Sequence, residues 1–154
     1  MAKRKPRLDT AAQAAASSLR YIESSALLAA LLEQDVQAVE DLRALGHRVT
    51  SALTFAETAR ALIRARASRR ITPAEERQAL RALRTFERRC AVVAVTNEIL
   101  VRAGRPFPVE PVRTLDAVHL ATVEFLGEPP QLVTIVTRDD RVRANARAFG
   151  YMVT

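Results

Sequence analysis

Short segments with strand character alternate with longer segments of helical periodicity, and this alternation constrains the fold of the chain more than any other feature. The predicted strands are 19–23, 47–51, 91–95 and 131–137, with 151–154 as a further edge strand. The predicted helices are 26–46 (one helix or two), 52–68, 73–89, 96–104, 115–127 and 139–150. Apolar strands separated by helices are typical of a parallel sheet that is covered on both faces. The sequence therefore predicts an α/β sandwich with a mainly parallel sheet.

Local signals add detail to this pattern. The residues that indicate an amphipathic helix over 52–68, because they recur at helical spacing, are Leu53, Ala56, Arg60, Ile63 and Ala67. Thr72 and Thr114 are each expected to cap the helix that follows, because a threonine oxygen can accept a hydrogen bond from the first helical turn. The apolar segment 91–95 is typical of a buried strand.

Acidic residues fall where such a sheet would place a ligand site. In open parallel sheets, ligands bind beyond the carboxyl ends of the strands, near the point where the strand order reverses. The acids that follow predicted strands or begin the helices after them are Glu23, Glu57, Asp116, Asp139 and Asp140. The pattern predicts that these side chains meet in one cleft.

Each acid also has an ordinary structural explanation. Asp116 and Asp139 would stabilise a helix dipole from its first turn, with no ligand involved. Glu57 could pair with an arginine one turn along its own helix. Glu23 fits such explanations less well, since it ends a strand expected at the centre of the sheet, where a buried charge needs compensation.

Taken together, the acids indicate a divalent metal site. Crowded carboxylates repel one another, and one of them would bind a proton unless a cation neutralised the group. Oxygen ligands in this number favour Mg²⁺ or Mn²⁺, and such ions activate water and stabilise charge on a phosphate. The acids therefore predict phosphodiester hydrolysis assisted by Mg²⁺ or Mn²⁺.

Residue counts exclude or disfavour several other chemistries. Cys90 is the only cysteine, which excludes an intrachain disulfide and a cysteine zinc site, and it is expected to be a buried hydrophobic residue. The two histidines, His47 and His119, are too few for a histidine-rich metal centre. Counting alone leaves a Ser–His–Asp triad open, but no G-x-S-x-G motif is present. Both lysines, Lys3 and Lys5, lie near the N-terminus, which disfavours P-loop and Schiff-base chemistry in the folded domain.

The basic charge of the chain is concentrated near its beginning. Five of the 24 basic residues, and a single acid, lie within residues 1–20. We therefore expect residues 1–19 to be a flexible basic extension, with a nucleic-acid-binding arm as the alternative, and residues 20–154 to form one domain. No apolar run reaches the roughly 18 residues that a membrane span needs, so a soluble cytoplasmic protein is expected.

Four motifs together resemble those of PIN-domain proteins, especially the VapC-type toxins of bacterial toxin–antitoxin pairs. These motifs are "YIESSAL", "SALTFAETARAL", "PVRTLDAVHLATV" and "IVTRDDRVRANARAFG", and the resemblance covers residues 20–153. It implies a three-layer sandwich with a parallel five-stranded sheet, a homodimer, and a metal-dependent endoribonuclease that a cognate antitoxin inhibits.

The resemblance also implies roles for individual residues. The four family acids, which are catalytic and bind the metal, correspond to Glu23, Glu57, Asp116 and Asp139. The supporting polar residues would be Ser24 and Thr137, whereas Asp140 lies one position beyond the family acid and is either a neighbour of the site or a surface residue. An antitoxin would place an arginine, or a peptide compatible with an acidic site, near these carboxylates.

Glu23 departs from the family pattern, which normally has aspartate at this position. Glutamate keeps the charge but adds a methylene, and a displacement of about 1 Å can cost on the order of 100-fold in rate. We expect retained or reduced activity. The alternative is a silent PIN-like module that binds RNA or protein. A different acidic phosphohydrolase is a third interpretation, disfavoured by the lack of a D-x-D strand motif.

Arginines near the second motif suggest a nucleic-acid contact. Arg60 and Arg64 lie one helical turn apart within the arginine-rich run 59–70. They could form a track for RNA phosphates beside the acidic cleft, or they could simply make up a solvated helix face. The expected partners are thus an RNA substrate, an antitoxin and a second copy of the chain, without a membrane.

Overall fold

Five parallel strands form the centre of the structure, a computed structural model that describes residues 18–154. The strands are β1 (Leu19–Ile22), β2 (His47–Ser51), β3 (Ala91–Val93), β4 (Val133–Val136) and β5 (Met152–Val153). Their order in the sheet is β3-β2-β1-β4-β5, and every neighbouring pair is parallel. The predicted extension at residues 1–19 lies outside the described residues, except for its last two positions.

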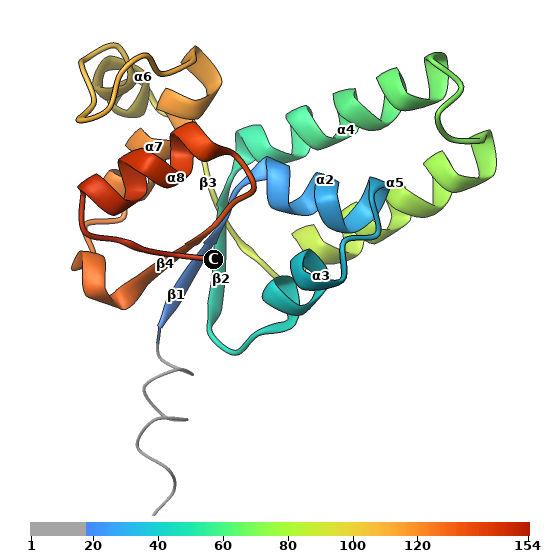
Figure 1. The fold of residues 1–154 in the computed structure, drawn as a ribbon, viewed down its shortest axis with the longest axis horizontal. Coiled ribbons are helices and arrows are strands. Elements are labelled where there is room, and N and C mark those ends of the chain that lie inside the picture. Colours follow the sequence, from blue (N-terminus) through green and yellow to red (C-terminus); the bar gives the residue numbers. More distant parts are fainter. Residues whose placement is uncertain (1–17) are drawn as a thin grey trace, which may run out of the picture.

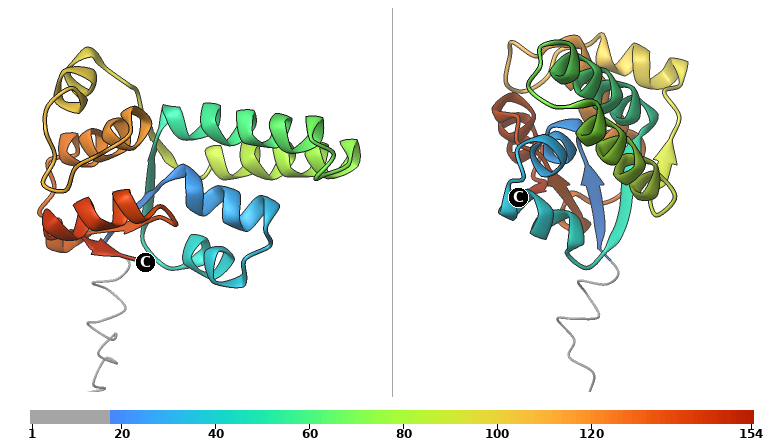
Figure 2. Two further views of the ribbon diagram at one scale, coloured as in Figure 1. Left: turned by 45° about the horizontal axis from the view of Figure 1, so that its top comes forward. Right: turned by 90° about the vertical axis from the view of Figure 1, so that its right-hand side faces the viewer.

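Helices connect the strands and cover the sheet. They are α2 (Ser24–Leu32), α3 (Val36–Arg43), α4 (Ala52–Ala67), α5 (Pro73–Glu87), α6 (Asn97–Ala103), α7 (Thr114–Phe125) and α8 (Asp140–Ala148), with a short 3₁₀ turn at Pro130–Leu132. Figure 1 shows α6, α7 and α8 gathered at one side of the molecule, while α4 and α5 run side by side and project from the other. The left view in Figure 2 shows the same arrangement.

The sheet separates two hydrophobic cores, which confirms the predicted three-layer α/β sandwich. Tyr21 belongs to the core formed with α6, α7 and α8, whereas the next residue, Ile22, belongs to the core formed with α2 and α5. Successive side chains of a strand point to opposite faces, so this division follows directly from the strand geometry. Both residues are fully buried, as expected for a central strand with helices on either side.

The strand order places the site. β1 pairs with β2 on one side and with β4 on the other, and Ile22 lies opposite Val136 at the carboxyl ends of β1 and β4. The chain direction across the sheet reverses between these two strands, which is where open α/β sheets leave a crevice for ligands. Glu23 and Thr137, the residues that follow the two strands, are therefore brought together at that crevice.

The predicted 26–46 segment forms two helices, and the predicted apolar face of 52–68 is wrong. Gln34 has a positive φ of 53° between α2 and α3, and Asp35 caps α3. The residues of α4 that are buried are Thr54, Thr58, Ala61, Leu62 and Ala65, whereas Ala56, Arg60, Ile63 and Ala67 are exposed. Short side chains let α4 approach its neighbours closely, and the buried Thr54 hydroxyl accepts a hydrogen bond from Thr50 at 2.8 Å. A threonine can be buried once its hydroxyl is hydrogen bonded inside the fold, as that of Thr54 is, so a hydrophobicity pattern does not reveal this face.

Two further expectations differ from the structure. β3 is an edge strand with β2 as its neighbour, and Val92 is 43% exposed, so the predicted buried strand is wrong. Thr72 caps α5 through a capping box as predicted, but α7 begins at Thr114 itself, after Arg113, without a side-chain cap.

Cys90 is half-buried, and desolvation raises the pKa of its thiol to about 12. Within residues 18–154, no helix has the length and apolar character needed to cross a membrane.

Candidate metal and catalytic site

Glu23 is the most extensively hydrogen-bonded side chain of the site. It is 3% exposed and caps the N-terminus of α2, where its Oε2 accepts a hydrogen bond from the backbone N–H of Ser25 at 3.1 Å. The Ser25 hydroxyl also donates to Oε2, as does the Thr137 hydroxyl at 2.9 Å, while the Ser24 hydroxyl donates to Oε1 at 2.6 Å. These donors and the helix N-terminus stabilise a buried carboxylate as an anion. The two serines after Glu23 thus hold its carboxylate in place through hydrogen bonds.

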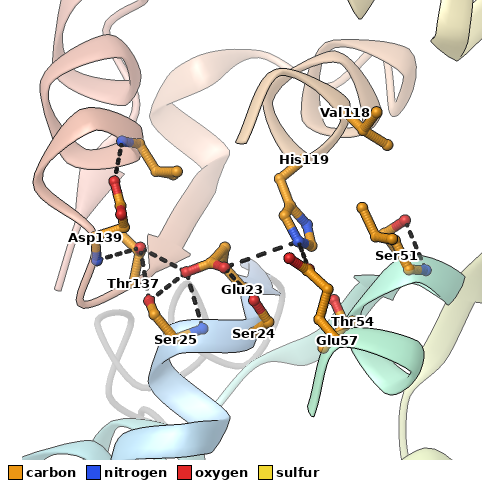
Figure 3. Close-up of polar contacts among 12 residues, drawn as sticks. Glu23, Ser24, Ser25, Ser51, Thr54, Glu57, Val118, His119, Thr137 and Asp139 are labelled. Atoms are coloured by element: carbon orange, nitrogen blue, oxygen red, sulfur yellow. Dashed lines mark hydrogen bonds and ion pairs between the residues drawn. The ribbon is translucent and has the colours of Figure 1, made fainter. Parts of the chain in front are cut away.

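The same hydroxyls bind the loop that follows β4. The backbone N–H of Asp139 donates to Thr137 Oγ1 at 3.0 Å, and that of Arg138 donates to Ser25 Oγ at 2.7 Å. Each hydroxyl accepts from the loop and therefore directs its single proton toward Glu23. Figure 3 shows this network between the beginning of α2 and the loop that ends at Asp139. The loop and the first carboxylate consequently share one set of hydrogen bonds.

Asp139 and Asp140 have different surroundings. Asp139 caps α8, because its Oδ1 accepts hydrogen bonds from the backbone N–H groups of Arg141 at 2.8 Å and Val142 at 3.1 Å. This geometry leaves Oδ2 of the same carboxylate available to the site. Asp140 is the first residue of α8 and is exposed, so the structure places it outside the hydrogen-bonded network.

Glu57 and His119 complete the centre of the site. His119 Nε2 lies 2.6 Å from Oε2 of Glu57, a residue of α4, and 3.8 Å from Oε1 of Glu23. Figure 3 shows the imidazole ring between the two carboxylates. The three side chains offer ligand atoms that all lie within 4.8 Å of one another. A metal ion could therefore bind at this point.

Asp116 lies one turn before His119 on α7. The surroundings of the Asp116 carboxyl group disfavour its negative charge. Burial raises the pKa of its carboxyl group, and the negative charges of Asp139 and Glu23 raise it further, against weaker opposition from Arg113 and His119. Its Oδ2 is buried and has no hydrogen-bond partner among the described residues. A divalent cation would supply that missing partner and neutralise the repulsion, so the residues present fit an oxygen-bound metal.

The remaining predicted residues line a groove beside the carboxylates. This groove has a volume of about 330 Å³, and two residues of the site, Ser24 and Glu57, are among those that line it. Leucine side chains contribute apolar walls, and Arg60 and Arg64 also line it. Both arginines are exposed, as expected for side chains that contact a polyanion or solvent. The predicted acids and arginines thus share one region of the surface.

Sequence reasoning missed His119 and Ser25. His119 lies three residues after Asp116, a spacing that puts both on one face of a helix, but counting histidines excluded only a histidine-rich centre and gave no role to a single one. Ser25 lies two residues after Glu23, the spacing at which a capping side chain meets the backbone. Arg138 was missed as well, and it forms ion pairs with Asp35 at 3.4 Å and Asp41 at 2.8 Å.

One family model and two curated proteins match most of the chain. The model of the PIN domain matches residues 20–148. Ribonuclease VapC46 of Mycobacterium tuberculosis is 37% identical over 135 residues, which cover 86% of this chain and 94% of that protein. Ribonuclease VapC35 of the same species is 31% identical over 137 residues, which cover 86% of this chain and 93% of that protein.

Solved structures share the fold at lower identity. The VapBC2 complex from Rickettsia felis, bound to a DNA fragment from its promoter, has a TM-score of 0.61 at 11% identity over 88% of this chain and 97% of that chain. A toxin–antitoxin complex from Klebsiella pneumoniae has a TM-score of 0.53 at 18% identity over 81% of this chain and 90% of that chain. At such identities the likeness concerns the fold alone.

Proposed function

Because the chain belongs to the PIN domain family, we propose that it is a metal-dependent endoribonuclease and the toxin of a VapC-type toxin–antitoxin pair. One observation carries the proposal: carboxylates converge where β1 and β4 end, and one of them, Asp116, has a buried oxygen without a hydrogen-bond partner among residues 18–154. The family and its curated relatives, which are named as ribonucleases, support RNA as the substrate.

The ion would be Mg²⁺ or Mn²⁺, held by oxygens of Glu23, Asp116 and Asp139, with Glu57 beside them. When bound, such an ion supplies an acidified water and positive charge that opposes the charge developing on the phosphodiester. Within residues 18–154, Oε1 of Glu23 accepts a hydrogen bond from Ser24 alone, and it therefore retains a lone pair for a cation. The unpaired Oδ2 of Asp116 and the oxygen of Asp139 that does not cap α8 provide further ligands of the same chemical type.

The hydrogen bonds of Glu23 support an active site despite the change from aspartate. Its longer side chain would cost activity if the carboxylate moved freely, because misplacement by about 1 Å can reduce a rate on the order of 100-fold. Four donors from Ser24, Ser25 and Thr137 hold the carboxylate instead. The chain therefore accommodates glutamate with its own polar groups, which favours a working nuclease over a silent binding module.

The chain's partners follow from the same proposal. Arg60 and Arg64 would bind RNA phosphates beside the cleaved bond, since they line the groove that adjoins Glu57. A cognate antitoxin would inhibit the enzyme by placing a cationic group near the carboxylates. We also propose a homodimer in the cytoplasm, which light scattering of the purified chain and fractionation of cells would test.

RNA cleavage by the purified chain tests the function directly. The reaction is run with Mg²⁺, with Mn²⁺ and with EDTA, alongside Asp116→Asn and an identically prepared blank that reports contaminating nuclease. Cleavage that requires the metal and falls at least about 100-fold in Asp116→Asn supports the proposal, since this carboxylate is assigned to the ion. Cleavage that survives EDTA, or that Asp116→Asn retains, contradicts it.

A further inference from the structure

His119 and Tyr21 form a buried pair whose contacts extend from the central strand to Glu57. Tyr21 is fully buried in β1 and His119 is 1% exposed on α7. The Tyr21 hydroxyl lies 2.8 Å from His119 Nδ1, and His119 Nε2 lies 2.6 Å from Oε2 of Glu57. Both nitrogens of the imidazole are therefore engaged by residues of other elements.

The distance to Glu57 decides which nitrogen of His119 carries the ring proton. An unprotonated Nε2 would direct its lone pair at a carboxylate oxygen only 2.6 Å away, which is a repulsive contact. Nε2 therefore carries the ring hydrogen and donates a hydrogen bond to Glu57. In the neutral ring, Nδ1 then accepts a hydrogen bond from the Tyr21 hydroxyl.

The geometry favours the Tyr21 phenol as the donor. Because Nε2 carries the ring hydrogen, Nδ1 of the neutral imidazole offers only a lone pair, and the Tyr21 hydroxyl lies 2.8 Å from it. Donation from tyrosine to Nδ1 selects the tautomer that has its hydrogen on Nε2.

We infer that Tyr21 and His119 are positioning residues for the carboxylate of Glu57, with Tyr21 selecting the His119 tautomer and the Nε2–H group orienting Glu57. The inference rests on the proposed metal-dependent nuclease and assigns residues that act through Glu57. Oε2 of Glu57 is occupied by this hydrogen bond, whereas its Oε1 has no hydrogen-bond partner among residues 18–154. The free oxygen of the carboxylate would thereby be oriented to hold a bound metal ion or its water.

This assignment differs from direct metal binding by His119. The position of its Nε2, near oxygens of Glu23 and Glu57, is also that of a ligand atom. A protonated nitrogen has no lone pair to give to a metal, however, and removing its proton would place two lone pairs 2.6 Å apart unless Glu57 turned away. His119 instead resembles the residues that do not bind a metal themselves but hydrogen bond to its ligands and orient them.

Nuclear magnetic resonance of the intact chain tests the tautomer without metal or RNA. The nitrogen-15 shifts of the imidazole identify which nitrogen is protonated, and we expect a proton on Nε2 of His119. Tyr21→Phe removes the hydroxyl without enlarging the side chain. Glu57 alone then favours the tautomer with hydrogen on Nε2, so the fraction of the other tautomer is expected to rise. A proton confined to Nδ1 in the native chain would overturn the inference.

Mn²⁺ affinity, measured by titration calorimetry, tests the positioning role. Changes to groups that orient metal ligands reduce affinity by about 10–100-fold, and we expect a loss in this range for His119→Asn and a smaller loss for Tyr21→Phe. His119→Gln should restore most of the affinity, since its longer amide can present an N–H group near the position of Nε2. Tyr151→Phe is the matched control, because this buried tyrosine packs against Phe149 away from the carboxylates.

The outcomes separate this role from the proposed function. If the native chain binds Mn²⁺ and the folded His119→Asn and Tyr21→Phe variants bind it equally well, the positioning role is wrong while the metal site stands. A nitrogen coupling from a directly bound imidazole in the electron spin echo of Mn²⁺ would also overturn it. A native chain that binds no Mn²⁺ overturns the metal-dependent function, and this role with it. If the native chain and the variants show the expected Mn²⁺ affinities but the native chain does not cleave RNA, the positioning role is supported and the ribonuclease assignment is refuted.

Discussion

Thr137 donates a 2.9 Å hydrogen bond to Glu23, although 114 residues separate them in the sequence. The bond joins the residues that follow β4 and β1, the two adjacent strands at whose ends the site lies. Both residues are buried, so the interaction is largely protected from competition by water. It ties the conformation of the loop before α8 to that of the first carboxylate.

Replacing Thr137 by valine should weaken both the fold and the metal site. The valine keeps the shape but removes a donor to Glu23 and an acceptor for the backbone N–H of Asp139. We expect a loss of about 1–3 kcal/mol in the free energy of unfolding and a decrease of about 10–100-fold in Mn²⁺ affinity. Urea denaturation and metal titration measure the two effects. Thr134→Val, a change within β4 and remote from the carboxylates, is the control and should leave metal affinity unchanged.

Asp116→Asn should stabilise the metal-free protein at neutral pH while it abolishes cleavage. The raised pKa of Asp116 means that folding disfavours its ionised form, so its stabilising contribution is complete below pH 3.8 and is lost as pH rises through the higher folded value. The asparagine variant avoids that loss. We expect a Tm higher by about 1–3 °C, since the group is only half-buried and solvent screens its charge.

Calorimetry from pH 3 to pH 8 checks this sign. The difference in Tm between Asp116→Asn and the native chain should be largest near neutral pH and should shrink in acid, where the native carboxyl group is protonated. Adding Mn²⁺ should raise the Tm of the native chain and leave the variant unchanged, because binding stabilises only the form that has the site. A variant that is less stable than the native protein at neutral pH would contradict the prediction.

Glu23→Asp should fail to increase activity, although aspartate is the usual residue of the family. The donors from Ser24, Ser25 and Thr137 are spaced for the longer side chain, and a shortened one would lose at least one of these hydrogen bonds. We expect a loss of about 1–2 kcal/mol in unfolding free energy, and RNA cleavage no faster than that of the native chain. Cleavage that rises tenfold or more would instead mean that glutamate had weakened the enzyme.

Arg60→Ala and Arg64→Ala should impair RNA binding more than catalysis. Both side chains line the groove beside Glu57, and neither forms an ion pair with its carboxylate in the described part of the chain. We expect KM to rise several-fold with kcat nearly constant, and the salt dependence of binding to fall by about 0.7 for each lost phosphate contact with single-stranded RNA. Arg77→Ala, an exposed change on α5, is the matched control. Equal effects at all three positions would indicate general charge attraction without a defined track.

Much of the fold was predictable because its signals are local. β2 occupies residues 47–51 as expected, and Thr72 with Glu75 forms the capping box of α5. Strand propensity, helical periodicity and caps depend on neighbours within a few residues, so they can be read without the tertiary structure. Burial was harder to predict, because β3 is exposed as an edge strand and α4 buries threonines and alanines in place of the predicted face.

By itself, the sequence determined which carboxylates follow the strands of a parallel sheet, since parallel strands present their carboxyl ends at one edge. Only the tertiary structure decided what these carboxylates contact. His119 meets Glu57 across 62 residues of sequence, and Tyr21 meets His119 across 98. Neither contact has a local signal, because each depends on how α4 and α7 pack around β1. The acids were therefore predictable from position, whereas the groups that hydrogen bond to them and set their charge were defined by packing between elements distant in the chain.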